Sequence, residues 1–300
     1  MARSFFKAAG LLAAQILLLC FLKNFLRLRW AQIETDAEQT VLQTAGITET
    51  NPDILENHST NPFSKIMESL LQTTSNSFCP CCGWSGPKFN EASGRLCECP
   101  VCRSRERHRL ACYELSNESL TTSNLPHPFR LVHFGAHMEM EKQLNTMERL
   151  DQVSVDFFYP GYNIYSELVL KADVTDLKLP DNFAQGIIIL HVLEHISKLE
   201  TAIDELERVL HRFGWIMFEV PCFDEPADCR SARNDTERLR CAGQIDHVWK
   251  FTRDNFNTMT ARFDCTFPNE VEIGTELVSK AGFRNVLFGG CHAICRPNDL

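Results

Sequence analysis

The sequence has little positive charge for its length. Its 30 Lys and Arg residues face 39 Asp and Glu residues, which leaves a formal net charge of -9. This balance argues against a general polyanion binder, and the chain also lacks the stacking aromatic pattern of an RNA-binding module. A hydrophobic content of 44% is enough for a substantial core. We therefore expect one globular domain of typical size with additions, and nucleic acid is not its default partner.

The N-terminal apolar run is slightly shorter than the roughly 20 residues of a spanning helix. It covers Ala8–Leu22, with basic residues on both sides and no acid among residues 1–30. No clear small-x-small cleavage site follows it. We predict that residues 1–30 form a single-pass signal anchor that places the protein at a membrane. A cleaved secretory signal leading to the secretory-pathway lumen and an organelle transit peptide stay open as alternatives. Residues 31–77 are polar and are predicted to be a linker.

The cysteines are not spread as in a small disulfide scaffold, because six of the 14 lie between Cys79 and Cys102. Cys79-x2-Cys82 and Cys99-x2-Cys102, with sixteen residues between the pairs, have the spacing of a four-thiolate zinc site. We predict a structural zinc knuckle over residues 78–110. Cys81 and Cys97 are further thiols, either of which can replace a ligand, and a pair of disulfides is the alternative. The basic run Arg103–Arg109 is predicted to start a helix that packs the knuckle onto the next domain.

The longest uniformly apolar segment in the second half of the chain is followed at once by ionisable residues. Residues 187–190 are Ile-Ile-Ile-Leu with no polar alternation, which indicates a strand buried on both faces of a parallel sheet. His191, Glu194 and His195 come directly after it. Ligands of open α/β sheets bind beyond the carboxyl ends of the strands, so we expect chemistry here.

From Phe129 onward, short apolar runs alternate with amphipathic segments, as in βαβ units. Arg130–Phe134 is predicted to be the first strand, Met138–Leu150 a helix, and Val153–Asp156 the next strand. The segment FGAHMEM, where the first strand passes into the helix, is not a GxGxxG motif, so its glycine signal is weak. Asp156 follows Gly135 by 21 positions, about where a carboxylate accepts hydrogen bonds from ribose hydroxyls. Leu199–Leu210 and Thr275–Ala281 are predicted to be helices, and Trp215–Val220 is predicted to be a strand. A polar insertion is expected from Cys222 to Gln244, and RNVLFGG and CHAICR are expected to form a terminal hairpin.

These residues resemble a known family. Four features follow one another in the order found in type 11 class I S-adenosylmethionine-dependent methyltransferases. They are an acidic loop, a strand ending before HVLEH, the helix and turn ELERVLHRFG, and a strand ending in Pro. The chain is similar in particular to a subgroup with an N-terminal cysteine knuckle, through CPCCG, CPVCRSRERHR and the later segment GQIDHVWKF. The resemblance implies a Rossmann-like α/β domain with a seven-stranded sheet, over residues 128–296. It departs from the family in its poor glycine loop and in Arg212-Phe213-Gly214 where relatives have Pro-Gly-Gly.

The resemblance also implies a cofactor site for S-adenosyl-L-methionine. Gly135 would lie by the methionine part, Asp156 would hold the ribose, Asp173 and Val174 would border the adenine, and His191 would sit at the exit of the fourth strand. From its place in the loop after a short strand, Asp173 is predicted to contact the ligand, and Asp176 to cap the turn.

Transfer of a methyl group from a sulfonium depends chiefly on positioning and desolvation. An alcohol or phenol acceptor also needs a base, for which His195, Asp246 and His247 are candidates by location. We predict methyl transfer to an unidentified small-molecule or protein acceptor. Three alternatives stay open. They are an inactive, zinc-binding interaction protein, a zinc peptidase of the HxxEH type at His191, Glu194 and His195, and a metal-assisted methyl transfer, since some similar methyltransferases hold a divalent ion with a Glu/His cluster at this position.

Overall fold

The computed structural model describes residues 61–70, 74–117, 120, 128–147, 150–157 and 170–298. By its contacts the chain divides into two units, Met1–Asn57 and His58–Leu300, and all the described residues belong to the second. The segment predicted to be an anchor, residues 1–30, and most of the predicted linker lie outside the described residues.

The predicted membrane location is wrong as far as the described part of the chain can test it, because no helix there is both long and apolar enough to span a bilayer. The longest of these helices, α5 (Leu199–Val209), has 11 residues. At 1.5 Å per residue it reaches about 16 Å, roughly half the thickness of a hydrocarbon core.

Seven strands form one sheet in the order β12–β13–β9–β8–β5–β6–β7, as the resemblance implies. Neighbouring strands from β9 to β7 run parallel, whereas β13 is antiparallel to both β9 and β12. In chain order the strands are β5 (Phe129–Phe134), β6 (Leu150–Asp156), β7 (Leu170–Lys171), β8 (Ala184–Leu190), β9 (Leu210–Pro221), β12 (Phe263–Thr266) and β13 (Gly290–Pro297).

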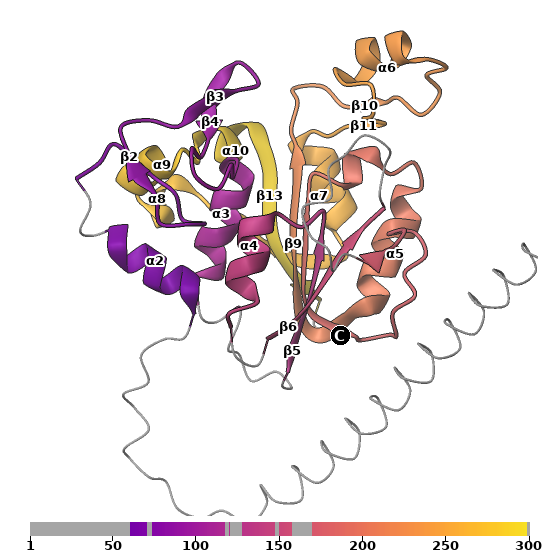
Figure 1. The fold of residues 1–300 in the computed structure, drawn as a ribbon. Helices are drawn as coiled ribbons and strands as arrows, with labels where there is room; N and C mark the ends of the chain where they lie inside the picture. The colour runs from indigo at the N-terminus through magenta and orange to yellow at the C-terminus, as the bar shows by residue number, and fades with distance from the viewer. Residues whose placement is uncertain are drawn as a thin grey trace, which may run out of the picture. The chain divides into compact units, whose positions relative to one another are not determined.

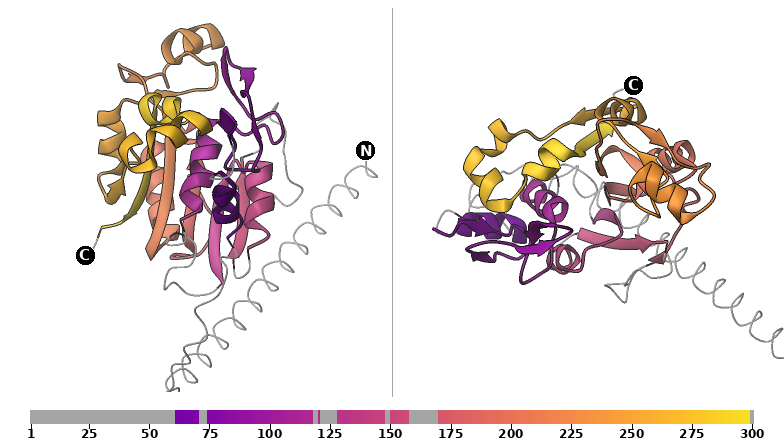
Figure 2. Two further views of the ribbon diagram at one scale, coloured as in Figure 1. Left: turned by 90° about the vertical axis from the view of Figure 1, so that its left-hand side faces the viewer. Right: turned by 90° about the horizontal axis from the view of Figure 1, so that it is seen from above.

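Helices cover both faces of this sheet (Figures 1 and 2). On one face lie α5 and α7 (Arg253–Thr260), whose apolar side chains share a core with the sheet. The other face is covered by α2 (Pro62–Leu70), α3 (Glu106–Leu115) and α4 (Met138–Leu144). A third, smaller cluster joins α3 to α9 (Thr275–Ala281) and α10 (Arg284–Gly289). The architecture is therefore a three-layer α/β fold.

Strand β8 lies in the middle of the sheet, and every one of its residues is buried. Ile187 and Ile189 belong to the core under α5 and α7, whereas Ile188 and Leu190 belong to the core under α3 and α4. Successive side chains of a strand point to opposite faces, so a strand covered on both sides favours apolar residues at consecutive positions. This confirms the prediction from the uninterrupted apolar run.

The segment that contains the paired cysteines forms two small hairpins ahead of α3. Strand β1 (Ser77–Phe78) pairs with β2 (Ser85–Gly86), and β3 (Asn90–Ala92) pairs with β4 (Arg95–Glu98). Cys79, Cys99 and Phe89 share a core with Phe129 and Leu131 of β5, so these hairpins pack directly on the sheet domain. We call residues 78–110 the cysteine knuckle.

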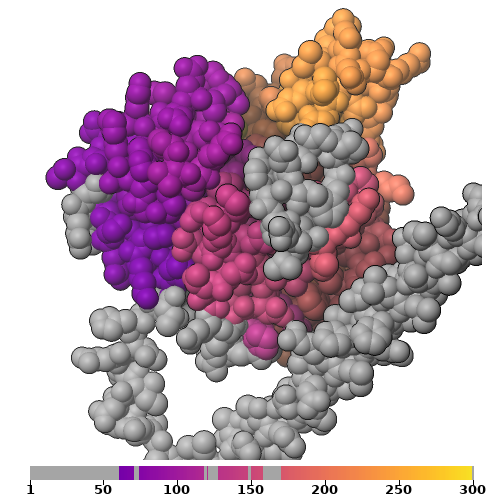
Figure 3. All heavy atoms as spheres, in the orientation of Figure 1, coloured from indigo at the N-terminus to yellow at the C-terminus, as the bar shows by residue number. Residues whose placement is uncertain are grey.

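The insertion after β9 contains β10 (Ala227–Asp228) and α6 (Asp235–Ala242), and β10 pairs with β11 (Trp249–Lys250). Three pairs of cysteines form disulfides: Cys222–Cys291, Cys229–Cys241 and Cys265–Cys295. The first and third bind β13 to the end of β9 and to β12, and the second closes the insertion. In Figure 3 the knuckle, in indigo and purple, and the insertion, in orange, form separate prominences of the surface.

The predicted C-terminal hairpin is wrong. Residues 284–289 form the helix α10 instead of a strand, and only the following segment enters the sheet, as β13. Val286 of α10 is buried with Val278 and Phe283. The apolar residues of this segment therefore form one face of a short helix and do not alternate with polar residues as in a half-buried strand. The predicted helix after Gly135 is also shorter than expected and ends at Leu144.

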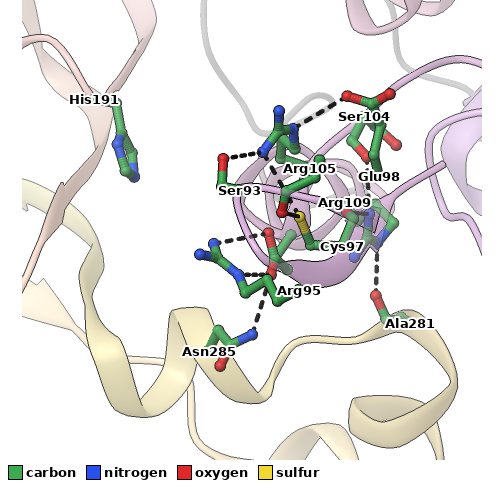
Figure 4. A network of polar contacts seen from close by, with 12 residues as sticks. Ser93, Arg95, Cys97, Glu98, Ser104, Arg105, Arg109, His191, Ala281 and Asn285 are labelled. Carbon is green, nitrogen blue, oxygen red and sulfur yellow. Dashed lines mark hydrogen bonds and ion pairs between the residues drawn. The ribbon is translucent and has the colours of Figure 1, made fainter. Parts of the chain in front are cut away.

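Arg109 of α3 fastens the knuckle to the rest of the domain (Figure 4). Its side chain is fully buried, and it donates hydrogen bonds to the carbonyl oxygens of Ala281, Cys97 and Ser104 at 2.6, 2.8 and 2.9 Å. Its guanidinium also stacks 3.9 Å from the centre of the Phe89 ring. The guanidinium therefore connects the knuckle to α9, which lies 172 positions further along the sequence.

We predict that Arg109→Met lowers the free energy of unfolding by about 2–4 kcal/mol, because it leaves three buried carbonyl groups without a donor. The measurement is urea denaturation of the full chain at fixed zinc concentration. Arg103→Met is the matched control, since the side chain of Arg103 is 76% exposed and makes one long ion pair. Equal midpoints for the two variants would contradict this role of Arg109.

Candidate functional site

The four predicted zinc ligands come together in the cysteine knuckle. The sulfur atoms of Cys79, Cys82, Cys99 and Cys102 all lie within 4.8 Å of one another. The separation is 3.6 Å between Cys79 and Cys102 and 3.7 Å between Cys82 and Cys99. Four sulfurs at about 2.3 Å from a tetrahedral zinc ion lie about 3.8 Å apart, whereas a disulfide needs about 2.05 Å. The donor set therefore fits zinc and does not have the geometry of the disulfide alternative.

The two further thiols have backbone partners of their own. The thiol of Cys81 donates to the carbonyl oxygen of His108 at 3.3 Å, and the thiol of Cys97 donates to that of Ala92 at 3.2 Å. Neither sulfur belongs to the group of four. The sequence spacing allowed either of these thiols to replace one of the four zinc ligands, whereas the geometry favours the two CxxC pairs as the ligands.

The residues predicted to hold the cofactor follow four adjacent parallel strands. Phe134 pairs with Val155 on one side and with Ile189 on the other, and Val155 pairs with Leu170. Gly135 and Asp156 are therefore level with each other at the carboxyl edge of the sheet, with Leu190 on one flank and Lys171 on the other. Gly135 has a φ of +57°, a conformation that glycine adopts without strain.

Asp173 closes the turn after β7. Its carboxylate accepts hydrogen bonds from both the backbone N–H and the hydroxyl of Thr175, each at 2.8 Å. Asp176 instead pairs with Lys178, so the turn-capping role predicted for Asp176 belongs to Asp173. Val174 is buried in the core beneath this turn.

His191 marks the exit of β8 with a strained backbone. Its φ is +55°, which is uncommon for a residue with a side chain and occurs often at functional sites. Its Nδ1 lies 3.3 Å from Oε1 of Glu194, and its Nε2 lies 3.3 Å from Oε1 of Glu219. Burial alone would lower the pKa of His191, but the two carboxylates outweigh it and raise the pKa to about 9.

Glu219 of β9 connects His191 to His292 of β13, whose Nδ1 lies 3.0 Å from Oε2 of Glu219. Burial would raise the pKa of Glu219, but the two imidazoles hold it down at about 2. Sequence reasoning missed both Glu219 and His292. A single acid inside the apolar strand Trp215–Val220 was the available signal, although only the pairing of β9 with β13 identifies its partner.

The three candidates for a catalytic base lie together beside the short 3-10 helix η3 (Leu193–His195). Nδ1 of His195 lies 3.1 Å from the backbone oxygen of Asp246, and the rings of His195 and His247 meet edge to face at 4.8 Å. The side chain of His195 is 30% exposed, against 17% for Asp246 and 3% for His247. Burial lowers the pKa of His247.

Glu194 and His195, together with His247, also form a group of potential metal donors. The HxxEH alternative needs His191 and His195 as the two histidine ligands, but His191 is not in this group, and η3 is a single short turn. The peptidase alternative stays an untested prediction.

A hollow of about 360 Å³ lies on another part of the surface, between the start of α5 and the insertion. Its walls include Lys198, Thr201, Arg230 and Trp249, and none of the predicted cofactor residues lines it. This hollow is therefore separate from the strand edge described above.

Comparison with known proteins agrees with the strand order. A family model described as a methyltransferase domain (Methyltransf_11) matches residues 136–218. No curated protein sequence matches the chain. This match and the strand order both agree with the S-adenosylmethionine-dependent methyltransferase fold that the sequence resemblance implies.

Solved structures with similar arrangements include the YcgJ protein of Bacillus subtilis, at 16% identity over 59% of this chain and 93% of that one, with a TM-score of 0.37. A methyltransferase of Archaeoglobus fulgidus matches at 14% identity over 65% and 95%, with a TM-score of 0.39. A Burkholderia thailandensis N1-methyltransferase, solved with 1,6-didemethyltoxoflavin and S-adenosylhomocysteine, matches at 14% identity over 65% and 87%, with a TM-score of 0.38. At these scores the similarities carry no argument about the substrate.

We predict that the purified full-length chain contains about one zinc ion per molecule and that Cys99→Ser loses it, because three thiolates and a hydroxyl hold zinc weakly. Elemental analysis after dialysis measures the zinc content. Cys81→Ser and Cys97→Ser are the matched controls, and both are expected to keep their zinc. Zinc retained by Cys99→Ser, or lost from Cys81→Ser, would contradict the assigned ligand set.

Proposed function

We propose that this protein binds S-adenosyl-L-methionine at the carboxyl edge of β5, β6, β7 and β8 and transfers its methyl group to a small-molecule or protein acceptor. The observation that carries the proposal is the row of predicted residues at this edge. β5 is also the point where the strand order reverses, since β6 continues on one side of it and β8 on the other. Ligands of open α/β sheets bind at such a switch point.

The roles of the individual residues follow from their places in the row. The glycine conformation at Gly135 lets the backbone turn at the end of β5, where the methionine part of the cofactor is expected. Asp156, the last residue of β6, would accept hydrogen bonds from the ribose hydroxyls. Asp173 and Val174 would border the adenine. Because one carboxylate oxygen of Asp173 already binds Thr175, its support for the adenine would come mainly from the shape of the turn.

The chemistry requires an in-line approach of the acceptor to the methyl group. The positive charge on the sulfonium disappears during the transfer, so exclusion of water and correct positioning supply most of the acceleration. The pair formed by the buried Glu219 and the partly exposed His191 would give this edge a fixed arrangement of charges next to the cofactor. Of the three proposed bases, His195 has the side chain that an acceptor can reach most easily.

The net charge of -9 and the absence of a stacking aromatic pattern support a small molecule or a protein side chain over nucleic acid as the acceptor. Incubating the full-length protein with methyl-tritiated cofactor and fractionated lysate would identify the class of acceptor by the fraction that becomes labelled.

We predict that Asp156→Ala weakens cofactor binding at least about tenfold, because hydrogen bonds to a charged carboxylate are worth roughly 1.5–3 kcal/mol. Isothermal calorimetry of the full chain with S-adenosylhomocysteine measures the affinity. Asp151→Ala is the matched control, since Asp151 is an exposed acid near the opposite end of the same strand.

An unchanged affinity in Asp156→Ala would reject the ribose assignment. No binding to the wild-type chain, in a sample that keeps its zinc, would instead favour the alternative of an inactive interaction protein.

A further inference from the structure

The carboxylate of Glu194 is buried beside a single close basic group, the imidazole of His191, which it shares with Glu219. Its side chain is completely buried, and neither oxygen has a hydrogen bond of acceptable geometry within the part of the chain that the structure describes. An ionised carboxylate in such a place costs several kcal/mol unless a cation or donors compensate it. The imidazole of His191, 3.3 Å from Oε1 of Glu194, compensates part of this charge but is shared with the equally buried Glu219, so the position can accommodate a further cation.

Three side chains converge on one point beside this carboxylate. Nε2 of His195 lies 3.9 Å from Oε1 of Glu194, and Nε2 of His247 lies 4.0 Å from the same oxygen. One donor atom from each of the three residues lies within 4.8 Å of the others. The two histidines come from segments about fifty positions apart, and the backbone N–H of Val248 holds those segments together by donating to the carbonyl oxygen of Glu194 at 2.8 Å.

The tautomer of His195 suits a metal ligand. Its Nδ1 faces the backbone oxygen of Asp246 at 3.1 Å, and this carbonyl can only accept, so the proton of the neutral ring belongs on Nδ1. The lone pair of Nε2 is then directed at Glu194. Histidine ligands of metals nearly always donate their other ring N–H to a carbonyl or carboxylate in this way. Oδ2 of Asp246 lies 3.6 Å from the same nitrogen and supports this orientation.

We propose that Glu194, His195 and His247 form a binding site for a divalent transition-metal ion, separate from the cysteine knuckle. Two imidazoles and one carboxylate suit Zn²⁺ or Fe²⁺ and leave positions open for water or another oxygen ligand. Ligand atoms at about 2.0 Å from a tetrahedral ion lie roughly 3.3 Å apart, so each of the two measured separations needs to close by about 0.6–0.7 Å. Only small side-chain rotations are needed for that change.

His191 completes the surroundings of this site without being counted as a ligand. Its Nδ1 lies 3.3 Å from Oε1 of Glu194, but its other nitrogen pairs with Glu219, which fixes the ring toward the sheet. The 30% exposure of His195 leaves a path by which an ion can enter. The proposal concerns the metal alone and does not depend on methyl transfer.

Titration with Co²⁺ of full-length protein that has been dialysed until only one zinc ion per molecule remains, in the cysteine knuckle, tests this site by visible absorbance. We expect a single additional Co²⁺ to bind and to give d–d bands without the near-ultraviolet charge-transfer band of cobalt thiolates, because no sulfur belongs to the ligand set. Glu194→Gln is expected to weaken this binding at least about tenfold. Glu141→Gln is the matched control, since Glu141 is another buried carboxylate, 7% exposed, and binds Ser154 instead.

Equal Co²⁺ affinities in the wild type and Glu194→Gln, or absorbance from thiolate coordination alone, would overturn the proposal. If circular dichroism shows that Glu194→Gln does not fold, His195→Ala takes its place, because that side chain is partly exposed and its loss leaves Glu194 in contact with His191. A folded His195→Ala that binds Co²⁺ like the wild type would equally reject the site. Calorimetry with S-adenosylhomocysteine on the same samples separates the outcomes: metal affinity lost with cofactor affinity kept supports the metal site and leaves the proposed function standing.

Discussion

Burial of β8 on both of its faces is the constraint from which the arrangement of the domain follows. Ile187 and Ile189 need one layer of helices, and Ile188 and Leu190 need another, so the strand can lie only in the interior of a sheet covered on both sides. At about 25 cal/mol per Å² of buried apolar surface, these four side chains stabilise the buried arrangement by several kcal/mol relative to an exposed one. The chain must then leave the apolar layer at His191, where the polar groups gather.

This exit explains why so many ionisable groups are buried in one place. Glu194 and Glu219 lie within 3.3 Å of the same imidazole, and His292 reaches Glu219 from β13. The cysteine knuckle contributes to the same region through α3: burial lowers the pKa of Arg107, although the carboxylates of Glu219 and Glu194 oppose this effect. Arg109 of the same helix is bonded to Ala281, so this helix also joins the knuckle to α9.

The sequence predicted those features that depend on local pattern. The apolar run gave β8, the CxxC spacing gave the four converging sulfurs, and the resemblance gave the strand order. It did not predict α10, because the apolar residues around Val286 fit a strand as well as a short helix and only packing against Phe283 decides between them. Contacts between different segments could not be predicted from a local pattern. They include the pairing of Glu219 with His292, the three disulfides, and the approach of His247 to Glu194. The turn is capped by Asp173 and not by Asp176, because the two acids share one turn and their spacing does not distinguish them.

Hydrogen–deuterium exchange of the full-length protein, with and without S-adenosylhomocysteine, tests the central claim that the carboxyl edge of β5 to β8 is the cofactor site. The account predicts slower exchange on cofactor addition in the segments that follow these strands, around Gly135, Asp156, Thr175 and Val192, because bound cofactor covers their backbone N–H groups. Protection confined to the hollow at Lys198 and Trp249, or no protection at these four positions while the cofactor binds, would contradict it.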